Sequence, residues 1–537
     1  MKKKLSLWGA VCLILVCLMQ MTVSATGNVT INQCIISAAN QVTVVATTVS
    51  NVPSDDNNYY LFALQPYETA IGARTNYCAV AAKAGTVKMT TTLDLNTAAS
   101  KLYSKFVVAV KSGGAFTPVS QEFYITNPEA VATKTAVNPV PKSIKGVTAD
   151  NAAIMDLANL GVQHASYELA VNRFFEPSAA YITYAYNGKA YNFSQTVVAE
   201  YDMIMTLFAT QGVEVTMNVV NYYNPATALT VKPTGRVAGY RHYAFNTDEQ
   251  AGAEALQALM VFLTERYSNF ATGLVTNWII GNEVNNNNPW YFAGNYNVNG
   301  FTNEYEKAFR MFYTAIKSTN ANARVLTCID QRWTWEDGTK NQYGAKKFID
   351  AFNVNVISHG NIDWGVAWHP HPVPLTAAKF WDMPVAYKRL NLIDHTPNTR
   401  MINPMNMEVF TNYMCQPAYL SPTGQVRYIM ISEILFNSMS SNEATQAASF
   451  AYAYKLAERN PHIKAFVVHR MVDSPYEKAS DKIACGLYNC DANGWASTPK
   501  QIYNVFKKID TADSYKVTEF AKGILGISDW SSIIKQH

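Results

Sequence analysis

The sequence lacks the motifs of several common protein classes. It contains no GxGxxG fingerprint and no P-loop, which argues against a nucleotide-binding α/β sheet. It contains no CxxC pair and no cysteine–histidine cluster with zinc spacing, so we expect no structural metal. After the N-terminal segment, no apolar run is long enough to span a bilayer, and we expect no membrane insertion.

Net charge is also nearly absent. The chain has 43 lysines and arginines against 39 aspartates and glutamates, and three of those lysines are the N-terminal residues Lys2, Lys3 and Lys4. The rest of the chain is therefore close to neutral. Because nucleic-acid-binding proteins carry a basic surface, we expect no nucleic-acid partner.

The N-terminus has the pattern of a cleavable signal peptide. Three lysines precede an apolar segment over residues 5–21, and Val23-Ser24-Ala25 supplies a small-x-small cleavage site. This pattern is typical of secretory signals, so residues 1–25 are predicted to be removed and the mature protein to be secreted. Six cysteines follow this segment. Their even number permits disulfides, and the favoured pair is Cys485 with Cys490.

The next segment is rich in short strands. Residues 26–127 contain β-branched and aromatic runs separated by turn residues, which predicts a small antiparallel β-sandwich domain. Such domains in secreted enzymes are either carbohydrate-binding modules or structural companions. Because the segment has no clear exposed tryptophan platform, we prefer the structural role. Residues 128–143 contain three prolines among small residues and are predicted to be a linker.

Residues 144–537 alternate between strand-like and helical patterns. Eight such strands with intervening helices predict a (β/α)₈ TIM barrel of the α/β class, and the long segments after strands two, three, four and six suit loops at its catalytic end. An open doubly wound sheet would also alternate, but it usually carries the glycine-rich motifs that are absent here. The predicted strands are 144–148, 162–171, 213–221, 274–282, 323–330, 362–370, 427–434 and 463–471.

Two glutamates stand at matching ends of these strands. Glu283 ends strand four and Glu433 ends strand seven. The carboxyl ends of barrel strands meet in one mouth, so the two carboxylates should lie close together. Such a pair can cleave a glycosidic bond, because one carboxyl can donate a proton while the other attacks the sugar or activates water.

With Asn282 before Glu283, this arrangement resembles the clan A (4/7) glycoside hydrolases. The resemblance covers about residues 143–508 and rests on motif position. It implies a retaining mechanism in which Glu283 is the acid/base, Glu433 is the nucleophile and Asn282 contacts the sugar 2-hydroxyl. The family within the clan is not assigned. Many clan members also carry an arginine on strand two and a tryptophan on strand eight. On strand two and just beyond it, this chain has instead Glu168, Asn172 and Arg173, and on strand eight it has His469 and Arg470.

Other residues are predicted to line the mouth. His369 and His371 follow strand six; as metal ligands they would need further ligands from other strands, so we favour a sugar-contacting or nucleophile-orienting role without metal. Polar and aromatic side chains at the ends of strands three, five and eight are further candidates for sugar binding: Asn218, Asn221, Tyr222, Trp333, Trp335, His469 and Arg470. Glu336 and Glu408 are rival acids that we place on the solvated surface.

The sequence therefore predicts a secreted retaining glycoside hydrolase that cleaves β-linked (equatorial) glycans. We expect an oligo- or polysaccharide substrate, no cofactor and a monomer. Glu283 should hold its proton in surroundings that Trp290, Tyr291 and Phe292 keep dry, and Glu433 should be ionised beside basic side chains. The alternative is a non-catalytic glycan-binding protein on the same scaffold. The departures from the clan pattern on strands two and eight are consistent with this alternative.

Overall fold

The computed structural model of the chain describes residues 28–336, 338 and 341–534. The predicted signal segment lies outside these residues. The chain forms two compact units. The first runs to Leu95 and adds Ser100–Asn127 and Val354–Asn361; the second comprises Asn96–Ala99, Pro128–Asn353 and the chain from Ile362 onward.

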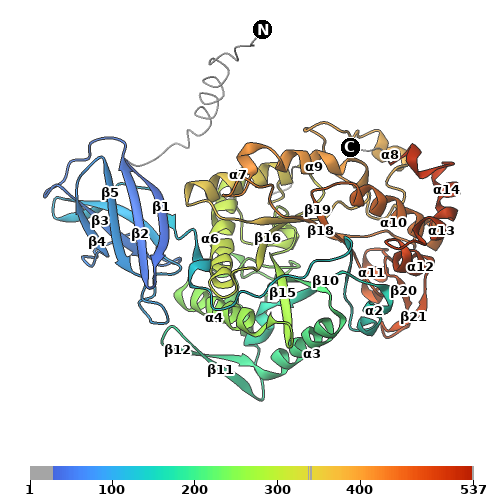
Figure 1. The fold of residues 1–537 in the computed structure, drawn as a ribbon, viewed down its shortest axis with the longest axis horizontal. Coiled ribbons are helices and arrows are strands. Elements are labelled where there is room, and N and C mark those ends of the chain that lie inside the picture. The colour runs from blue at the N-terminus through green and yellow to red at the C-terminus, as the bar shows by residue number, and fades with distance from the viewer. Residues whose placement is uncertain (1–27, 337, 339–340, 535–537) are drawn as a thin grey trace, which may run out of the picture. The chain divides into compact units, whose positions relative to one another are not determined.

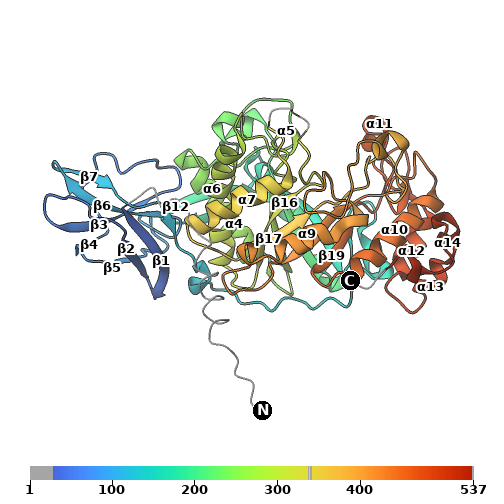
Figure 2. The same ribbon diagram turned by 90° about the horizontal axis from the view of Figure 1, so that it is seen from above.

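The first unit is an antiparallel β-sandwich, as the sequence predicts (Figure 1, Figure 2). Along β5 (Thr86–Thr92) every second side chain is buried, because successive side chains of a strand point to opposite faces of the sheet. One sheet has the order β1-β2-β5, and the other has the order β4-β3-β6-β7 with β8 beside β6. The remaining strands are β1 (Val29–Ala38), β2 (Gln41–Thr48), β3 (Asn58–Leu64), β4 (Ala79–Ala82), β6 (Lys105–Ser112), β7 (Ala115–Pro118) and β8 (Phe123–Tyr124).

The second unit contains a closed barrel of eight parallel strands, which confirms the predicted (β/α)₈ fold. The strands follow the order β13-β10-β9-β19-β18-β17-β16-β15, and the pairing of β13 with β15 closes the ring. All eight predicted strands are present. They are β9 (Lys145–Thr148), β10 (His164–Ala170), β13 (Glu214–Val220), β15 (Gly273–Ile280), β16 (Arg324–Ile329), β17 (Gly365–Trp368), β18 (Ile429–Ile434) and β19 (Ile463–Val468).

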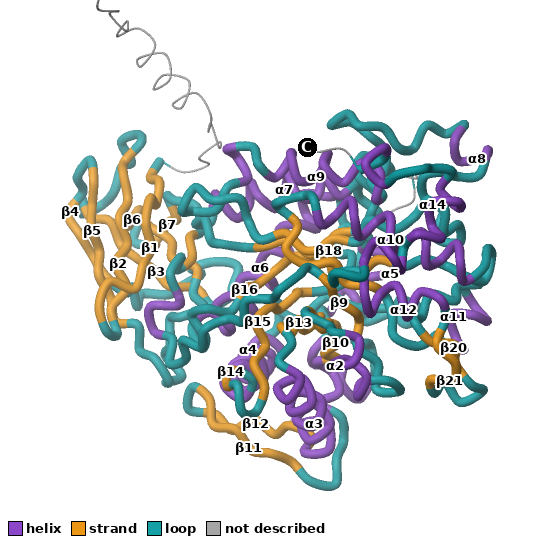
Figure 3. Tube along the Cα trace, turned by 45° about the vertical axis from the view of Figure 1, so that its right-hand side comes forward, coloured by secondary structure: helices purple, strands orange, loops and turns teal. Residues whose placement is uncertain are grey.

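Helices surround the barrel strands (Figure 3). Local sequence sets several of their ends: Asn297 and Asn442 cap α6 and α10 by accepting backbone N–H groups, and Gly212, with φ +65°, ends α3. The larger helices are α3 (Gln195–Gln211), α4 (Gln250–Arg266), α6 (Val298–Lys317), α7 (Ala345–Ser358), α9 (Met407–Met414), α10 (Glu443–Glu458) and α12 (Gln501–Lys508). Shorter ones are α2 (Leu157–Leu160), α5 (Asn287–Trp290), α8 (Val385–Lys388), α11 (Pro475–Ser480), α13 (Ser514–Val517) and α14 (Glu519–Leu525).

Three short antiparallel additions decorate the barrel. The hairpin of β11 (Tyr181–Tyr186) and β12 (Lys189–Ser194) turns at Asn187-Gly188, where both residues have positive φ, as a tight hairpin turn requires. The others are β14 (Ser268–Asn269), which pairs with β15, and the pair β20 (Tyr488–Cys490) and β21 (Ala496–Pro499).

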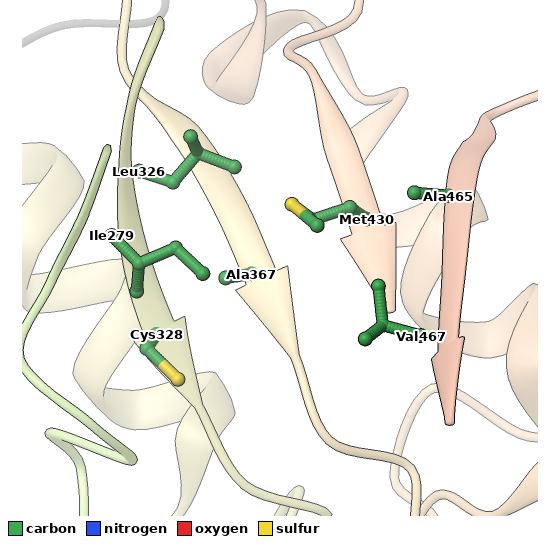
Figure 4. Close-up of a cluster of buried hydrophobic side chains, with 7 residues drawn as sticks. All are labelled: Ile279, Leu326, Cys328, Ala367, Met430, Ala465 and Val467. Carbon is green, nitrogen blue, oxygen red and sulfur yellow. The ribbon is translucent and has the colours of Figure 1, made fainter. Parts of the chain in front are cut away.

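The interior of the barrel is filled by apolar side chains that point inward from five neighbouring strands, β15 to β19 (Figure 4). A barrel of this size has a packed core rather than a pore, so ligands can bind only at its ends. The residues of this cluster are Ile279, Leu326, Cys328, Ala367, Met430, Ala465 and Val467.

One prediction was wrong. The six cysteines among the described residues are free thiols, so the predicted bond between Cys485 and Cys490 is absent; Cys485 instead packs in a buried cluster with Leu435 and Ile483. No helix of the described residues is long and apolar enough to cross a bilayer.

Candidate active site

A cavity of about 680 Å³ opens at the carboxyl ends of the barrel strands. Every barrel strand, or the loop directly after it, contributes to its wall. The contributors in strand order are Thr148, Glu168, Asn218, Glu283, Asp330, His369, Glu433 and His469. Both predicted catalytic glutamates are among them, so the barrel brings together two residues that are far apart in the sequence.

The imidazole of His371 lies close to both carboxylates. Its Nε2 atom is 3.9 Å from Oε1 of Glu283 and 3.6 Å from Oε1 of Glu433. The sum of these distances is an upper bound on the separation of the two oxygens. That bound includes the ~5–5.5 Å typical of retaining glycosidases and excludes the upper part of the ~6.5–9.5 Å range of inverting ones.

Glu283 is held by a hydrogen-bonded network. Its Oε1 atom lies 2.9 Å from Nδ1 of His369, and its backbone N–H donates to Sγ of Cys328 at 3.3 Å. Burial raises the pKa of Glu283 above its usual range, and the His369 contact only partly opposes this rise. Glu283 is therefore the carboxyl of the pair that keeps its proton more readily, as a general acid must.

Glu433 lies in the opposite environment. Burial alone would raise its pKa, but surrounding positive charge lowers that pKa to about 2. The groups responsible are His469, His369, His371 and Arg470. His371 contributes charge only in acid, because burial lowers its own pKa to about 3. Glu433 is thus ionised across the neutral range, as a nucleophile must be.

Strands two and three form a second polar group in the cavity. Tyr222 donates its hydroxyl hydrogen to Oε1 of Glu168 at 2.8 Å, and Nε2 of His242 lies 3.2 Å from the same hydroxyl. Nδ2 of Asn218 donates to Oδ1 of Asn282 at 3.1 Å. This hydrogen bond fixes the orientation of the Asn282 side-chain amide, so its NH₂ group remains available as a donor. These side chains offer both donors and acceptors to a polyhydroxylated ligand.

The two residues predicted at strand eight also line the cavity. His469 lies 4.0 Å from Glu433 and 3.3 Å from Glu477. Arg470 pairs with Asp150 at 2.6 Å and lies 3.5 Å from Glu477. Both side chains lower the pKa of Glu433 through their positive charge, and carboxylates hold the imidazole of His469 and the guanidinium of Arg470 in place.

Three predicted binding residues do not reach the cavity. Trp333 is buried, packs on Phe410 and Tyr413, and donates its indole N–H to the carbonyl of Pro397. Trp335 stacks on Arg400 instead of facing the mouth. Asn221 is buried and exchanges hydrogen bonds with Thr230.

The rival acids also lie elsewhere. Glu336 pairs with Lys347 outside the cavity, and Glu408 pairs with His395. Of the predicted water-excluding rings, Trp290 lines the cavity, whereas Tyr291 and Phe292 are buried beside it.

Several cavity residues were missed by the sequence reasoning. They belong to the long loops after strands three and eight, where no strand end marks them: Arg241, His242, Tyr476 and Glu477. An aromatic and basic run, residues 240–243, was the only local signal for the first two.

Within the part of the chain that the structure describes, two side-chain groups have the composition of metal sites, and neither fits one. In the first, Glu283, His369 and His371, both ring nitrogens of His369 already face hydrogen-bond partners. In the second, His469, Glu477 and Cys485, the guanidinium of Arg470 lies beside the carboxylate where a cation would bind. We therefore assign both groups to hydrogen-bonded and ion-paired networks.

Comparison with known proteins identifies a protein family that matches this chain. The family described as "Family of unknown function (DUF5722)" matches residues 137–533. Curated proteins give no match. A solved family 39 glycoside hydrolase from Bacteroides cellulosilyticus WH2 is similar with a TM-score of 0.44 and 14% identity, over 90% of this chain and 82% of that chain. The beta-glucosidase of Pyrococcus furiosus has a TM-score of 0.44 and 13% identity, over 70% and 88%.

Proposed function

The chain belongs to the DUF5722 family, and we propose that it is a retaining glycoside hydrolase that acts on β-linked (equatorial) glycans. The observation that carries this proposal is a pair of carboxylates, Glu283 and Glu433, that both lie within 4 Å of His371 and have pKa values shifted in opposite directions. Two carboxyl groups with separate protonation states are what general-acid and nucleophilic roles require.

The reaction proceeds in two steps on these groups. Glu283 donates its proton to the glycosidic oxygen while Glu433 attacks the anomeric carbon, so the leaving sugar departs as an alcohol and a glycosyl ester forms on Glu433. The ionised Glu283 then takes a proton from water, and the resulting hydroxide attacks the ester and releases Glu433. In this proposal Asn282, which accepts a hydrogen bond from Asn218, binds the hydroxyl next to the reacting carbon.

The predicted leader, residues 1–25, supports secretion, and we propose that the enzyme meets its substrate outside the cell. Both reacting groups are side chains, so the proposed reaction requires no cofactor. We further propose that the enzyme acts as a monomer, since one chain supplies the complete cavity.

The decisive variant is Glu433→Ala, tested with aryl β-glycosides and β-glycan oligosaccharides that the wild type cleaves. Turnover should fall by orders of magnitude, and added azide should restore part of it by forming a glycosyl azide of inverted configuration. Proton NMR of the first wild-type product should show the β anomer. Full turnover by the variant would overturn the assignment. Glycan binding without any product from the folded wild type would favour a binding protein instead.

A further inference from the structure

The cavity is lined by three arginines, and two of them are ion-paired with carboxylates of the protein. Nε of Arg332 donates to Asp330 at 2.7 Å, and Arg470 pairs with Asp150 at 2.6 Å. Among the described residues, no carboxylate lies within ion-pairing distance of Arg241, and its guanidinium donates to no other side chain. Arg241 is thus the arginine of this cavity whose positive charge has no partner in the protein.

Aromatic rings nevertheless hold Arg241 at the cavity. Its guanidinium carbon lies 5.9 Å from the ring centre of Trp290 and 5.3 Å from that of Tyr476. These rings come from α5 and α11, which lie at the same end of the barrel in Figure 2. An aromatic ring is not a conventional hydrogen-bond acceptor, so these contacts leave the N–H donors of the guanidinium available to a ligand. Those donors match the two oxygens of a carboxylate or sulfate.

The neighbouring side chain does not supply a competing charge. His242 is buried, and this burial lowers its pKa to about 4, so the imidazole is neutral in the neutral range. Its Nε2 atom is engaged with Tyr222, whose hydroxyl hydrogen is donated to Glu168. On this side of the cavity, Arg241 is therefore the group suited to a negative ligand.

We propose that Arg241 forms a subsite for the anionic group of an acidic glycan, either the carboxylate of a uronic acid residue or a sulfate ester. The inference rests on the proposed function for the cleavage step, and it names the substrate class of that site. Neutral regions of the same glycan would contact the hydroxyl-binding groups of strands two to four.

Binding can be tested separately from cleavage. The Glu433→Gln variant is applied to a glycan array with uronic acid-containing, sulfated and neutral members, and compared with a variant that also carries Arg241→Gln. We expect binding to concentrate on acidic members and to weaken about 10–100-fold in the double variant. Arg241→Lys, which keeps the charge but not the planar fork, should lose part of the binding.

The outcomes separate the two proposals. Preference for carboxylated over sulfated members, or the reverse, identifies the anion. Binding only to neutral glycans, no binding at all, or equal binding with and without Arg241→Gln would overturn the anionic subsite. Absence of cleavage by the wild type on the glycans that bind would count against the proposed hydrolase and leave the subsite intact.

A separate observation concerns Cys328, a buried thiol on β16 in the core cluster of Figure 4. Its Sγ accepts the backbone N–H of Glu283 at 3.3 Å and lies 3.4 Å from Nε2 of His369. The other ring nitrogen of His369 meets the Glu283 carboxyl. One sulfur atom therefore contacts the main chain of Glu283 directly and its side chain through an imidazole.

Glu283 requires such support, because its φ of +40° lies in the left-handed region that side chains other than glycine rarely adopt. We infer that Cys328 is a positioning residue for Glu283, fixing both the strained backbone and the orientation of His369. This inference also rests on the proposed role of Glu283.

The test compares Cys328→Ala with Cys328→Ser and with Val467→Ala, which makes a cavity in the same cluster without touching Glu283. We expect Cys328→Ala to lower turnover of substrates with poor leaving groups about 10-fold and to move the basic limb of the pH profile, whereas Cys328→Ser restores part of both. Val467→Ala should lower thermal stability and leave the pH profile unchanged.

A second measurement does not depend on turnover. The ¹⁵N NMR shifts of the His369 imidazole should change in Cys328→Ala and not in Val467→Ala, because only the first removes the partner of Nε2. Unchanged shifts, or identical pH profiles for both alanine variants, would overturn the positioning role. A wild type without hydrolytic activity would instead refute the proposed function.

Discussion

Glu283→Gln tests the proton donor most directly. Glutamine keeps the size of the side chain, and the bond to Cys328 uses the main-chain N–H of residue 283, so the local fold should be retained. The amide cannot donate a proton to the leaving oxygen. General acid catalysis contributes roughly 10²–10⁴-fold to a rate, and substrates with alcohol leaving groups should lose about that much. This loss corresponds to about 3–5 kcal/mol of transition-state stabilisation.

Two measurements distinguish the loss of the proton donor in Glu283→Gln from a general disruption of the active site. Activated aryl glycosides need little protonation, so their glycosylation rate should fall far less than that of unactivated oligosaccharides. The pH profile should also change. Because burial raises the pKa of Glu283, the protonated, active form persists to higher pH, and wild-type activity should be lost as pH rises through that pKa. Glu283→Gln should lack this basic limb.

Equal losses of the glycosylation rate on both kinds of substrate would refute the assignment of Glu283 as the acid. The search would then move to Glu168, which lines the cavity and whose pKa is raised by burial. Glu336 is a weaker candidate because it pairs with Lys347 outside the cavity. Steady-state kinetics on a matched pair of aryl and alkyl glycosides suffices for the comparison.

Three other changes have defined outcomes. His369→Asn should move both limbs of the pH profile to higher pH, because the imidazole lowers the pKa values of Glu283 and Glu433. Trp333→Ala should lower the free energy of unfolding by about 3–5 kcal/mol in urea titrations, with little change in KM, since the ring is core rather than a sugar contact. Lys500→Met should lower the free energy of unfolding by about 3–5 kcal/mol in the same titration, because it removes the ion-pair partner, 2.7 Å away, of the buried Asp473 carboxylate.

Two of these changes have a matched control. Asp382 pairs with Lys388 on the surface, so Lys388→Met should change stability by only about 0–1 kcal/mol. Trp290→Ala should raise KM more than Trp333→Ala does, because Trp290 lines the cavity. An increase in KM for Trp333→Ala alone, or a His369→Asn profile with limbs moved in opposite directions, would contradict the assigned positions.

The barrel and the proposed catalytic pair, Glu283 and Glu433, could be predicted from the sequence because their signals are local. A buried run such as that before Gly281 marks a strand, and the residues that follow it mark the mouth. The position of Trp333 was not accessible, because its loop is polar in sequence but is covered by Phe410 and Tyr413 from far along the chain. Arg241 was missed for the same reason: only the folded loops bring Trp290 to it.

The departures from the clan pattern also have a physical consequence. Where many clan members carry a basic residue on strand two, β10 offers Glu168, whose pKa is raised by burial and by the nearby charge of Glu433. The positive charge that lowers the pKa of Glu433 comes first from His469 in the loop after β19, at 4.0 Å, then from His369 and His371 after β17, and then from Arg470. Arg470 is anchored by carboxylates, so its charge is fixed before substrate binds. An ionised Glu433 is therefore compatible with a strand-two glutamate, because the compensating charge comes from the loops after strands six and eight of the same ring.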